Sequence, residues 1–530
     1  MTPLVSVVVP VYNTMPYLRA CLDSVLAQTL GIDEIEIVAV DDGSTDTSAA
    51  ELDRYAASYP DTVRVVHQPN SGGPAQPCNR GLELAVGRYV FFLGADDYLG
   101  PEALERLVRN AEDWSSDVIF GRMVGENGRS VDQRMFTSTR RDVDFLGAPL
   151  AYTLSNTKLF RRSLIDELGL HYSLDLRIGS DQPFAVAALL GARRVSVVAG
   201  YPCYHAVRRD DASNISYATD WRTKASDIAA IIDHLAELTP AGPTRDALLS
   251  RHFHWEIDLL LRNNFVGLLP ADRADLGARV AALADSYLTP GVEARLTAAG
   301  RIRVRLAQLG ALDTLAEVID VAREHPVRAM TLTGERVLDW FPALDPVTGT
   351  CPPGWSTSWS ELVTEDVGAR LRSRTQVTEV RVEGSRLVLA GTVGLRPASA
   401  PYLRVVITAL GDREPGPPDR WWPTATVPAA LVTSGVSLVA GPDSASSTMH
   451  AELDLRPLVA ASRSGVRRWS IRLRSEVADR VHDQPLRCVG LTLSTTFGLR
   501  HRLRYDRHHV GVLADPTGQL VLRCAAATTS

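Results

Sequence analysis

Short apolar runs alternate with helical patterns in the N-terminal part of this chain, and this alternation most constrains its fold. The runs Val7 to Val11 and Ile35 to Val40 are each followed by a segment with apolar residues at helical spacing. Alternation of this kind predicts parallel β-α-β units, and continuous apolar runs indicate strands covered on both faces. Such sheets bind ligands beyond the carboxyl ends of their strands. The polar clusters that follow the runs are therefore the candidate site.

Two polar clusters directly follow the first two runs. They read PVYN at residues 10–13 and VDDGSTD at residues 40–46. In order and spacing they resemble the opening motifs of family 2 glycosyltransferases with the GT-A fold, and the resemblance continues to about Ser216. It implies a Rossmann-like α/β domain that binds a nucleotide-diphospho-sugar.

The resemblance places Pro10, Tyr12, Asp41 and Asp42 against the nucleotide. Carboxylates at the end of a strand can accept hydrogen bonds from a uracil N–H and from ribose hydroxyls, while the rigid sheet holds them in place. The alternative is a turn that caps a helix, because Asp42 and Ser44 are both good N-cap residues.

A glycine-rich turn and a helical pattern follow, in QPNSGGPAQPCNRGLEL. Gly72 and Gly73 permit a close approach of the backbone. By the resemblance, Asn70 and Asn79 contact the nucleotide. The chain departs from its relatives at Cys78, where they usually have arginine, so an arginine that could meet phosphate is missing. An ordinary loop is the alternative.

The next cluster is FLGADDYLG, which contains Asp96 and Asp97. Relatives usually have a carboxylate where this chain has Gly94. Asp96 matches the carboxylate that touches the metal in the family. Mn²⁺ or Mg²⁺ prefers oxygen ligands and neutralises the charge that grows on a diphosphate leaving group. An acidic turn before a helix is the alternative.

The segment LRIGSDQPFAVAALL resembles the helix start that presents the catalytic base of the family, and Asp181 matches that base. An inverting transfer needs a carboxylate that takes the proton of the acceptor hydroxyl, on the face opposite the leaving diphosphate. Ser180 and Asp181 could instead cap the helix. Both roles can coexist, because a helix N-terminus favours a charged carboxylate.

The segment YPCYHAVRRDDASNIS resembles the part that closes the diphosphate side of the site. His205 is the candidate to complete the metal shell or to contact phosphate. Arg208, Arg209 or Ser213 could neutralise the leaving group. The alternative for His205 is ordinary packing beside Tyr204.

The pattern changes after residue 220, where we place the end of the GT-A domain (residues 1–220). Residues 221–330 predict a helical extension that completes the catalytic unit. Prolines mark residues 331–373 as a linker. Residues 374–530 contain many short strands with turn signals, which predict an all-β, immunoglobulin-like sandwich for oligomerisation or polymer binding. This order is similar to that of bacterial wall teichoic acid glycosyltransferases.

Arginines recur at near-alternating positions from Arg463 to Arg507. A strand face with this charge could hold a polyanion. A solvated strand face and an arginine-rich oligomer contact are alternatives. The residues concerned are Arg467, Arg468, Arg472, Arg474, Arg500, Arg502 and Arg504, with His501, His508 and His509.

The composition is that of an ordinary globular chain, with 45% hydrophobic and 22% charged residues and a net charge of −6, so we expect no nucleic acid partner. The chain has no apolar run of about 18 residues and no signal-peptide pattern at its start. Its 6 cysteines form no CxxC pair. We therefore expect a cytoplasmic protein with at most peripheral association with the inner face of the membrane.

The predicted function is metal-dependent, inverting transfer of a sugar from a UDP-sugar to a hydroxyl. The acceptor is a glycan, a polyol-phosphate polymer such as teichoic acid, or a lipid-linked molecule, and the protein is a homo-oligomer through its C-terminal domain. The alternative is a catalytically impaired protein of GT-A fold that binds a glycan or nucleotide, and Gly94 and Cys78 favour this alternative.

Overall fold

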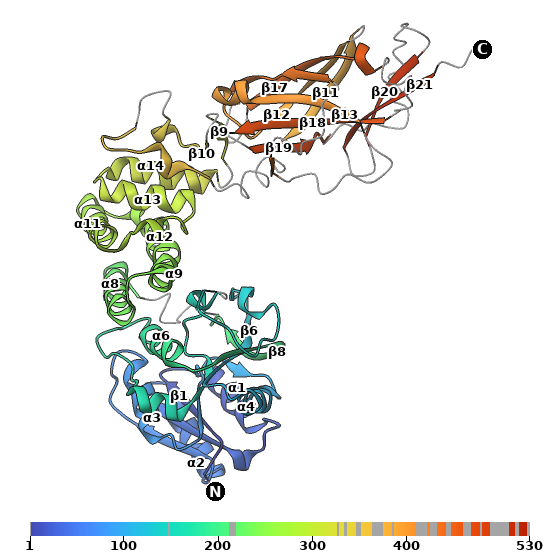
Figure 1. The fold of residues 1–530 in the computed structure, drawn as a ribbon. Helices are drawn as coiled ribbons and strands as arrows, with labels where there is room; N and C mark the ends of the chain where they lie inside the picture. The colour runs from blue at the N-terminus through green and yellow to red at the C-terminus, as the bar shows by residue number, and fades with distance from the viewer. Residues whose placement is uncertain are drawn as a thin grey trace. The chain divides into compact units, whose positions relative to one another are not determined.

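The computed structural model divides the chain into two compact units (Figure 1), Met1–Phe265 with Ala282–Leu296 and Val266–Ala281 with Thr297–Ser530. Each unit is considered by itself. The residues that the structure describes are 2–146, 149–210, 219–325, 328–332, 336–345, 351–362, 375–383, 386–409, 421–423, 432–440, 447–458, 468–477, 480–487, 508–514 and 519–526.

The first unit is built on an eight-stranded sheet in the order β3-β2-β1-β4-β7-β6-β8-β5. β1 pairs in parallel with β2 and β4, and β2 pairs in parallel with β3. The parallel β-α-β units predicted from the alternating pattern are therefore confirmed. The strands are β1 (Val5–Val11), β2 (Ile35–Asp41), β3 (Val63–His67), β4 (Tyr89–Phe92), β5 (Tyr98–Leu99), β6 (Val118–Glu126), β7 (Lys158–Arg161) and β8 (Val195–Val207).

Helices cover both faces of this sheet (Figure 1). Leu18 and Leu104, from α1 and α4, share a core with Val7, whereas Gly81 of α3 lies against Val8. Successive strand residues point to opposite faces, so α3 covers the other side of the sheet. The helices are α1 (Tyr17–Leu26), α2 (Ser48–Ser58), α3 (Ala75–Leu84), α4 (Ala103–Trp114), α5 (Arg162–Leu168) and α6 (Asp181–Gly191).

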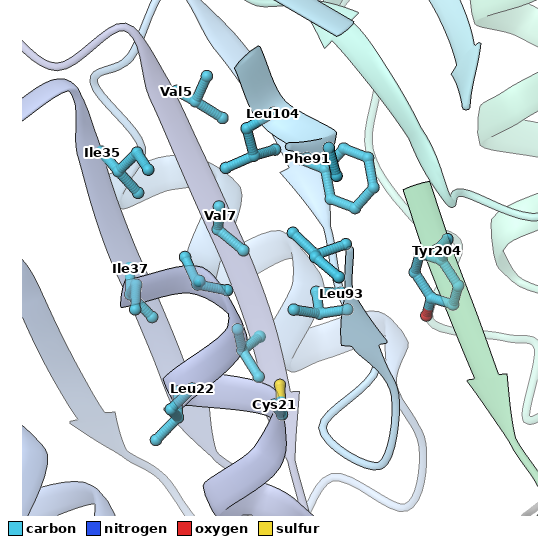
Figure 2. Close-up of a cluster of buried hydrophobic side chains, with 14 of the residues drawn as sticks. Val5, Val7, Cys21, Leu22, Ile35, Ile37, Phe91, Leu93, Leu104 and Tyr204 are labelled. Atoms are coloured by element: carbon cyan, nitrogen blue, oxygen red, sulfur yellow. The ribbon is translucent and has the colours of Figure 1, made fainter. Parts of the chain in front are cut away.

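The core between the sheet and α1 fixes the central strands. Figure 2 shows Val7 and Ile37 of neighbouring strands close to Cys21 and Leu22 of α1, and all four side chains are fully buried. Burial of an aliphatic side chain of this size contributes about 1.5 to 3 kcal/mol. The carboxyl ends of the strands therefore form a rigid edge on which polar loops can be placed.

The chain after the sheet is helical. Asp220 begins α8 by accepting hydrogen bonds from the backbone N–H groups of Arg222 and Thr223, as a good N-cap does. A π-helical turn, His252–Ile257, precedes α10. Among the described residues, no helix is both long enough and apolar enough to cross a bilayer. The helices are α8 (Trp221–Leu238), α9 (Pro243–Arg251), α10 (Asp258–Asn264), α11 (Pro270–Tyr287), α12 (Pro290–Glu293), α13 (Ala298–Gln308) and α14 (Leu312–Glu324).

The second unit contains two larger antiparallel sheets, one in the order β11-β12-β17-β16 and one with the path β14-β19-β18-β13-β15, to which β21 and β20 add beside β18. Its strands are β9 (Met330–Leu332), β10 (Val337–Asp339), β11 (Gln376–Glu383), β12 (Arg386–Val393), β13 (Leu403–Ala409), β14 (Trp421–Pro423), β15 (Val432–Gly435), β16 (Ser437–Ala440), β17 (Ser447–Asp454), β18 (Arg468–Val477), β19 (Arg480–Pro485), β20 (His508–Ala514) and β21 (Leu520–Ala526).

Both sheets contribute to one apolar core, in which Leu389 of β12 lies in the same cluster as Trp469 of β18. The β-rich C-terminal part is therefore confirmed as two sheets around a shared core. Leu332 and Leu362 belong to the same cluster, so part of the stretch predicted as a linker packs with this unit.

Two arginines of the predicted charged strand face are buried. Arg472 and Arg474 of β18 are 6% and 9% exposed. Ile471 and Leu473, which alternate with them, fill the core on the opposite face. The interpretation as an open polyanion surface or a solvated face is therefore wrong for these two residues, because both faces of β18 are covered there. Arg467, Arg500, Arg502, Arg504 and His501 lie outside the described residues.

The contact between α3 and β1 predicts a stability effect. A Cβ at Gly81 would overlap the side chain of Val8, which has no room to move in the closely packed sheet. Gly81→Ala should therefore lower the free energy of unfolding by about 1 to 3 kcal/mol, as overpacking does. Thermal unfolding followed by calorimetry measures this effect. Gly200→Ala is the matched control, because a Cβ at Gly200 would meet nothing within 4 Å. Equal melting of both variants would contradict the prediction.

Candidate nucleotide-sugar site

Parallel pairing brings the ends of three strands together. Val11 is opposite Asp41, and Asp41 is opposite His67, so the loops after β1, β2 and β3 begin side by side. The backbone N–H of Asp42 donates to the carbonyl of Val11 at 2.8 Å, which extends this pairing into the loops. The polar clusters predicted from the sequence therefore share one edge of the sheet.

Asp42 organises the glycine-rich turn. Its carboxylate accepts hydrogen bonds from Gln68 Nε2 at 2.6 Å, and from the backbone N–H and hydroxyl of Ser71 at 3.0 and 2.8 Å. Its carbonyl accepts a bond from Asn70 Nδ2 at 3.0 Å. The carboxylate is 3% exposed as part of this network, so its first effect is to fix the turn on the end of β2.

The Asp41 carboxylate is held by Ser44, in the loop that follows β2, and by His67. Its Oδ1 accepts a bond from the backbone N–H of Ser44 at 3.0 Å, and its Oδ2 lies 2.9 Å from His67 Nδ1. Burial raises the pKa of Asp41, but the bonds from His67 and Ser44 outweigh it and lower the pKa below its usual range. The other ring nitrogen of His67 lies 3.1 Å from Asp53.

The other predicted nucleotide residues differ in accessibility. Tyr12, the residue directly after β1, is 46% exposed, and Pro10 within β1 is partly buried. Asn70 is exposed, and its Oδ1 accepts a bond from the backbone N–H of Gly72 at 3.0 Å. Asn79 instead donates to the carbonyl of Tyr172 at 2.9 Å and accepts from its N–H at 2.7 Å. The Asn79 side chain thus holds the segment that leads to Asp181.

Asp97, next to Asp96 in the chain, has a buried and hydrogen-bonded carboxylate. It is 6% exposed and accepts bonds from the Tyr204 hydroxyl at 2.5 Å and the Val207 N–H at 2.7 Å. Burial first, and the neighbouring charge of Asp96 second, raise the pKa of Asp97. A Cβ at Gly94 would lie 2.8 Å from the Asp97 carboxylate. In this arrangement a side chain at position 94 would require the Asp97 carboxylate to shift.

Asp96 is paired with an arginine from a distant part of the chain. Arg209 Nε donates to Asp96 Oδ2 at 2.9 Å, and its Nη1 donates to the Asn13 carbonyl at 3.2 Å. The side chain of Arg209 is 15% exposed and that of Asp96 is 16% exposed. The Arg208 side chain is exposed, and its N–H donates to the Glu126 carbonyl at 3.4 Å. Ser213 lies outside the described residues.

His205 is oriented by a carboxylate and an aromatic ring. Its Nδ1 lies 2.8 Å from Glu126 Oε1, and its ring stacks on Tyr98 with centroids 4.4 Å apart. The bond to His205 lowers the pKa of Glu126. A carboxylate on one ring nitrogen is the arrangement that leaves the other free to bind a cation. Within the described ranges, no three His, Cys, Asp or Glu side chains gather as a complete metal site.

Asp181 begins α6, as the sequence pattern predicts. One helical turn later, Phe184 stacks on Tyr172 with centroids 4.6 Å apart and meets Phe92 edge-on at 5.6 Å. Phe92 is the last residue of β4, so this aromatic cluster anchors the helix start to the sheet. Phe184 is visible in the sequence three positions after Asp181, but only folding brings Tyr172 and Phe92 to it.

The environment of Asp181 suits a proton acceptor. Burial is the larger effect and raises the pKa of Asp181, while the Lys158 charge opposes it. Lys158 is 1% exposed and lies 4.5 Å above the Phe120 ring, and burial lowers its pKa to about 7. A general base works best when its pKa approaches the working pH. No role for Lys158 is apparent from the sequence, because its proximity to Asp181 arises only from folding.

The fold matches that of a solved glycosyltransferase. A crystal structure of Staphylococcus aureus TarS superposes with a TM-score of 0.60 at 20% identity, covering 99% of this chain and 85% of that one. The match concerns the fold alone. A shorter TarS structure, residues 1–349 in complex with UDP-GlcNAc, has a TM-score of 0.56 at 26% identity and covers 64% of this chain and 98% of that one. The first unit therefore has a GT-A-like sheet.

Two family models match the chain. Residues 6–169 match Glycosyl transferase family 2, and residues 225–319 match the Glycosyl transferase TarS linker domain. The poly(ribitol-phosphate) β-glucosyltransferase of Bacillus spizizenii is 39% identical over 206 residues, and the TarS N-acetylglucosaminyltransferase of S. aureus is 36% identical over 205 residues. Residues 6–169 are thus similar to the glycosyl transferase family 2, and the chain is similar to poly(ribitol-phosphate) glycosyltransferases.

These relatives are matched over part of their length. Each match covers 39% of this chain, and 32% of the B. spizizenii protein or 36% of the S. aureus protein. The chain thus spans about a third of each relative's length in these matches. The match to the family 2 model, residues 6–169, lies in the first unit.

The His67 contacts predict a pH-dependent stability. Bonds to Asp41 and Asp53 raise the pKa of His67 above its usual 6.5. The stabilisation is therefore complete below about pH 6.5 and is lost as the pH rises through the folded pKa. His67→Gln should cost more free energy of unfolding at about pH 6 than at about pH 9. Denaturant unfolding at both pH values measures this cost, with His171→Gln as control because that ring contacts the carbonyl of Gly169. A cost that grows with pH would contradict the prediction.

Proposed function

We propose that the protein is an inverting glycosyltransferase that moves a sugar from a UDP-sugar to a hydroxyl of a polyol-phosphate polymer such as teichoic acid. The observation that carries this proposal is the shared sheet edge, with Asp42, Asp96 and their loops, beside a helix that begins at Asp181. The names of the relatives support the acceptor class, and the TarS complex with UDP-GlcNAc supports the donor class.

In the proposed reaction, the acceptor oxygen attacks the anomeric carbon of the sugar from the side opposite UDP. Asp181 takes the proton of the acceptor hydroxyl as the new C–O bond forms, and the bond to the diphosphate breaks. Burial raises the pKa of Asp181, which makes its carboxylate a stronger base than that of an ordinary aspartate. Pro10, Tyr12, Asp41, Asp42, Asn70 and Asn79 bind or shape the nucleotide pocket.

A divalent cation, Mn²⁺ or Mg²⁺, would be held by Asp96, in the loop after β4, and His205 of β8 only together with the donor. Asp96 offers a carboxylate and His205 an imidazole oriented by Glu126, so oxygen atoms of the diphosphate would complete the ligand set. When bound, the cation supplies positive charge to the leaving diphosphate. Arg209 neutralises Asp96 in the free protein and is close enough to the same edge to meet phosphate, as is the exposed Arg208.

The second candidate function is a catalytically impaired protein of the same fold that binds a nucleotide or glycan. The Asp96–Arg209 ion pair favours it, because this pair must open before Asp96 can bind a cation. Buried Cys78 also replaces an arginine that could meet the nucleotide. Transfer activity separates the two candidates.

We further propose that the protein acts in the cytoplasm, with peripheral contact to the inner face of the membrane. Residues 1–220 would form the GT-A domain, residues 221–330 the helical extension and residues 331–373 the linker. Residues 374–530 would form an immunoglobulin-like sandwich that joins copies of the chain or binds the polymer. The mass of the full chain in light scattering tests the oligomer.

Asp181→Asn tests the base. Transfer from UDP-GlcNAc or UDP-glucose to poly(ribitol phosphate) should fall by about 10² to 10⁴ in kcat, which is the usual contribution of a general base. The dissociation constant for UDP, measured by calorimetry, should stay unchanged. Asp175→Asn is the control, because this exposed carboxylate lies on the same segment. Substantial turnover by Asp181→Asn would remove the base assignment, and a wild-type protein that binds UDP without transfer would favour the second candidate function.

Asp96→Asn tests the cation site. The concentration of Mn²⁺ that supports half-maximal UDP binding should rise by at least about tenfold, since loss of even an outer partner of a metal weakens binding by that factor. Calorimetric titration with UDP at several Mn²⁺ concentrations measures the change. The exposed Asp210→Asn is the control. UDP binding that is indifferent to Mn²⁺ in the wild type would overturn the metal proposal while leaving the base proposal open.

A further inference from the structure

The loop before the candidate base is held by a buried carboxylate of the helical extension. Asp227 of α8 is 7% exposed, and its Oδ2 accepts hydrogen bonds from the backbone N–H groups of Arg177 at 3.1 Å and Ile178 at 2.9 Å. Bonds of backbone N–H groups to a carboxylate are about twice as strong as neutral ones. A single oxygen atom therefore fixes two successive peptide groups just before α6.

We propose that Asp227 is a positioning residue for transfer, which holds the backbone that places the Asp181 carboxylate. This inference rests on the proposed function and concerns the same site. Asp227 contacts no reacting group and acts through the loop.

The same face of α8 also packs, through Ile231, against the turn at Gly179 that follows these peptide groups. Gly179 has φ +69°, and a Cβ there would lie 2.8 Å from Cδ1 of Ile231. Asp227 and Ile231 are four residues apart, so they occupy neighbouring positions on one face of α8. Figure 1 shows α8 beside α6, with which it is in contact. The carboxylate and the apolar side chain together determine where the turn into α6 begins.

The fixed loop also faces the nucleotide side of the site. A Cβ at Gly73 would lie 3.3 Å from the carbonyl oxygen of Arg177. The peptide groups held by Asp227 are therefore wedged between α8 and the glycine-rich turn that Asp42 organises. Displacement of this loop would change the position of Asp181 relative to the bound donor.

A second group of contacts holds the residue after Asp181. The Gln182 side chain lies 2.8 Å from His252 Nε2, accepts a bond from Arg251 Nη1 at 3.1 Å and donates to Glu256 at 2.9 Å. His252 and Glu256 belong to the π-helical turn, a feature frequent at functional sites. Gln182 is thus held from the π-helical turn, whereas Asp227 holds the backbone on the other side of Asp181.

The consequence for catalysis follows from geometry. A reacting group displaced by about 1 Å can lose about 10²-fold in rate while binding is retained. Asp227→Ala leaves the two N–H groups of Arg177 and Ile178 without their acceptor. Asp227→Asn removes the charge and replaces one oxygen atom with an NH2 group, but its remaining oxygen atom can accept both bonds, so it should retain the loop.

The experiment compares these two variants with the wild type in full-length protein. We expect Asp227→Ala to lower kcat about 10- to 100-fold, with the UDP dissociation constant changed less than about twofold. Asp227→Asn should stay within about threefold of the wild-type kcat, because an amide oxygen can still accept from both N–H groups. Glu237→Ala is the matched control, because this carboxylate lies on the exposed face of α8. Hydrogen exchange at the amides of Arg177 and Ile178 should accelerate in Asp227→Ala and remain slow in Asp227→Asn.

The outcomes distinguish this inference from the proposed function. No transfer by the wild type removes the proposed function and the inference with it. An active wild type and an unchanged kcat in Asp227→Ala overturn the inference alone. If kcat, UDP binding and the melting temperature of Asp227→Ala all fall together, Asp227 has a purely structural role. This outcome would also overturn the inference. If Asp227→Ala does not fold, Asp227→Glu tests the inference instead. This variant keeps a carboxylate but moves its oxygen atoms away from the two N–H groups. A wild-type kcat in Asp227→Glu would overturn the inference.

Discussion

The parallel pairing of β1 with β2 and β4 is the constraint on which the rest of the site depends. It places the loops that carry Asp41, Asp42 and Asp96 at one edge of the sheet. Carboxylates so gathered repel one another, and the cost is large where water is excluded. His67 and Arg209 offset that charge from other parts of the chain. The edge is stable in the free protein because these partners fold onto it.

The same requirement separates the roles of neighbouring aspartates. Asp97 is buried, with its oxygen atoms bound by Tyr204 and Val207, so it supports the turn. Asp96 is instead paired with Arg209, and both side chains of this pair remain partly exposed. Gly94 fits this division, because Asp97 fills the space that a side chain there would need. A missing carboxylate in the motif is thus compatible with an intact site.

The helical segment after the sheet contacts the residues around Asp181 directly. Asp227 and Glu256 contact the residues on either side of Asp181, and both belong to the first unit. The β-sheet edge fixes the loops that carry Asp42 and Asp96, whereas these helices fix the start of α6 at Asp181. The precision of the arrangement therefore depends on residues that are more than 40 positions from Asp181 in the chain.

The sequence by itself determined the strands, the helices and the placement of polar clusters at strand ends, because hydrophobic periodicity and turn chemistry are local. It also located Asp181 at a helix start. Only the tertiary structure decided which partners these residues have. The pairs Asp96 with Arg209, Asp41 with His67 and Asp227 with Ile178 join segments far apart in the chain. The burial of Arg472 likewise follows from packing on both faces of a strand. Such contacts depend on how the elements are arranged in space, and no spacing in the sequence encodes them.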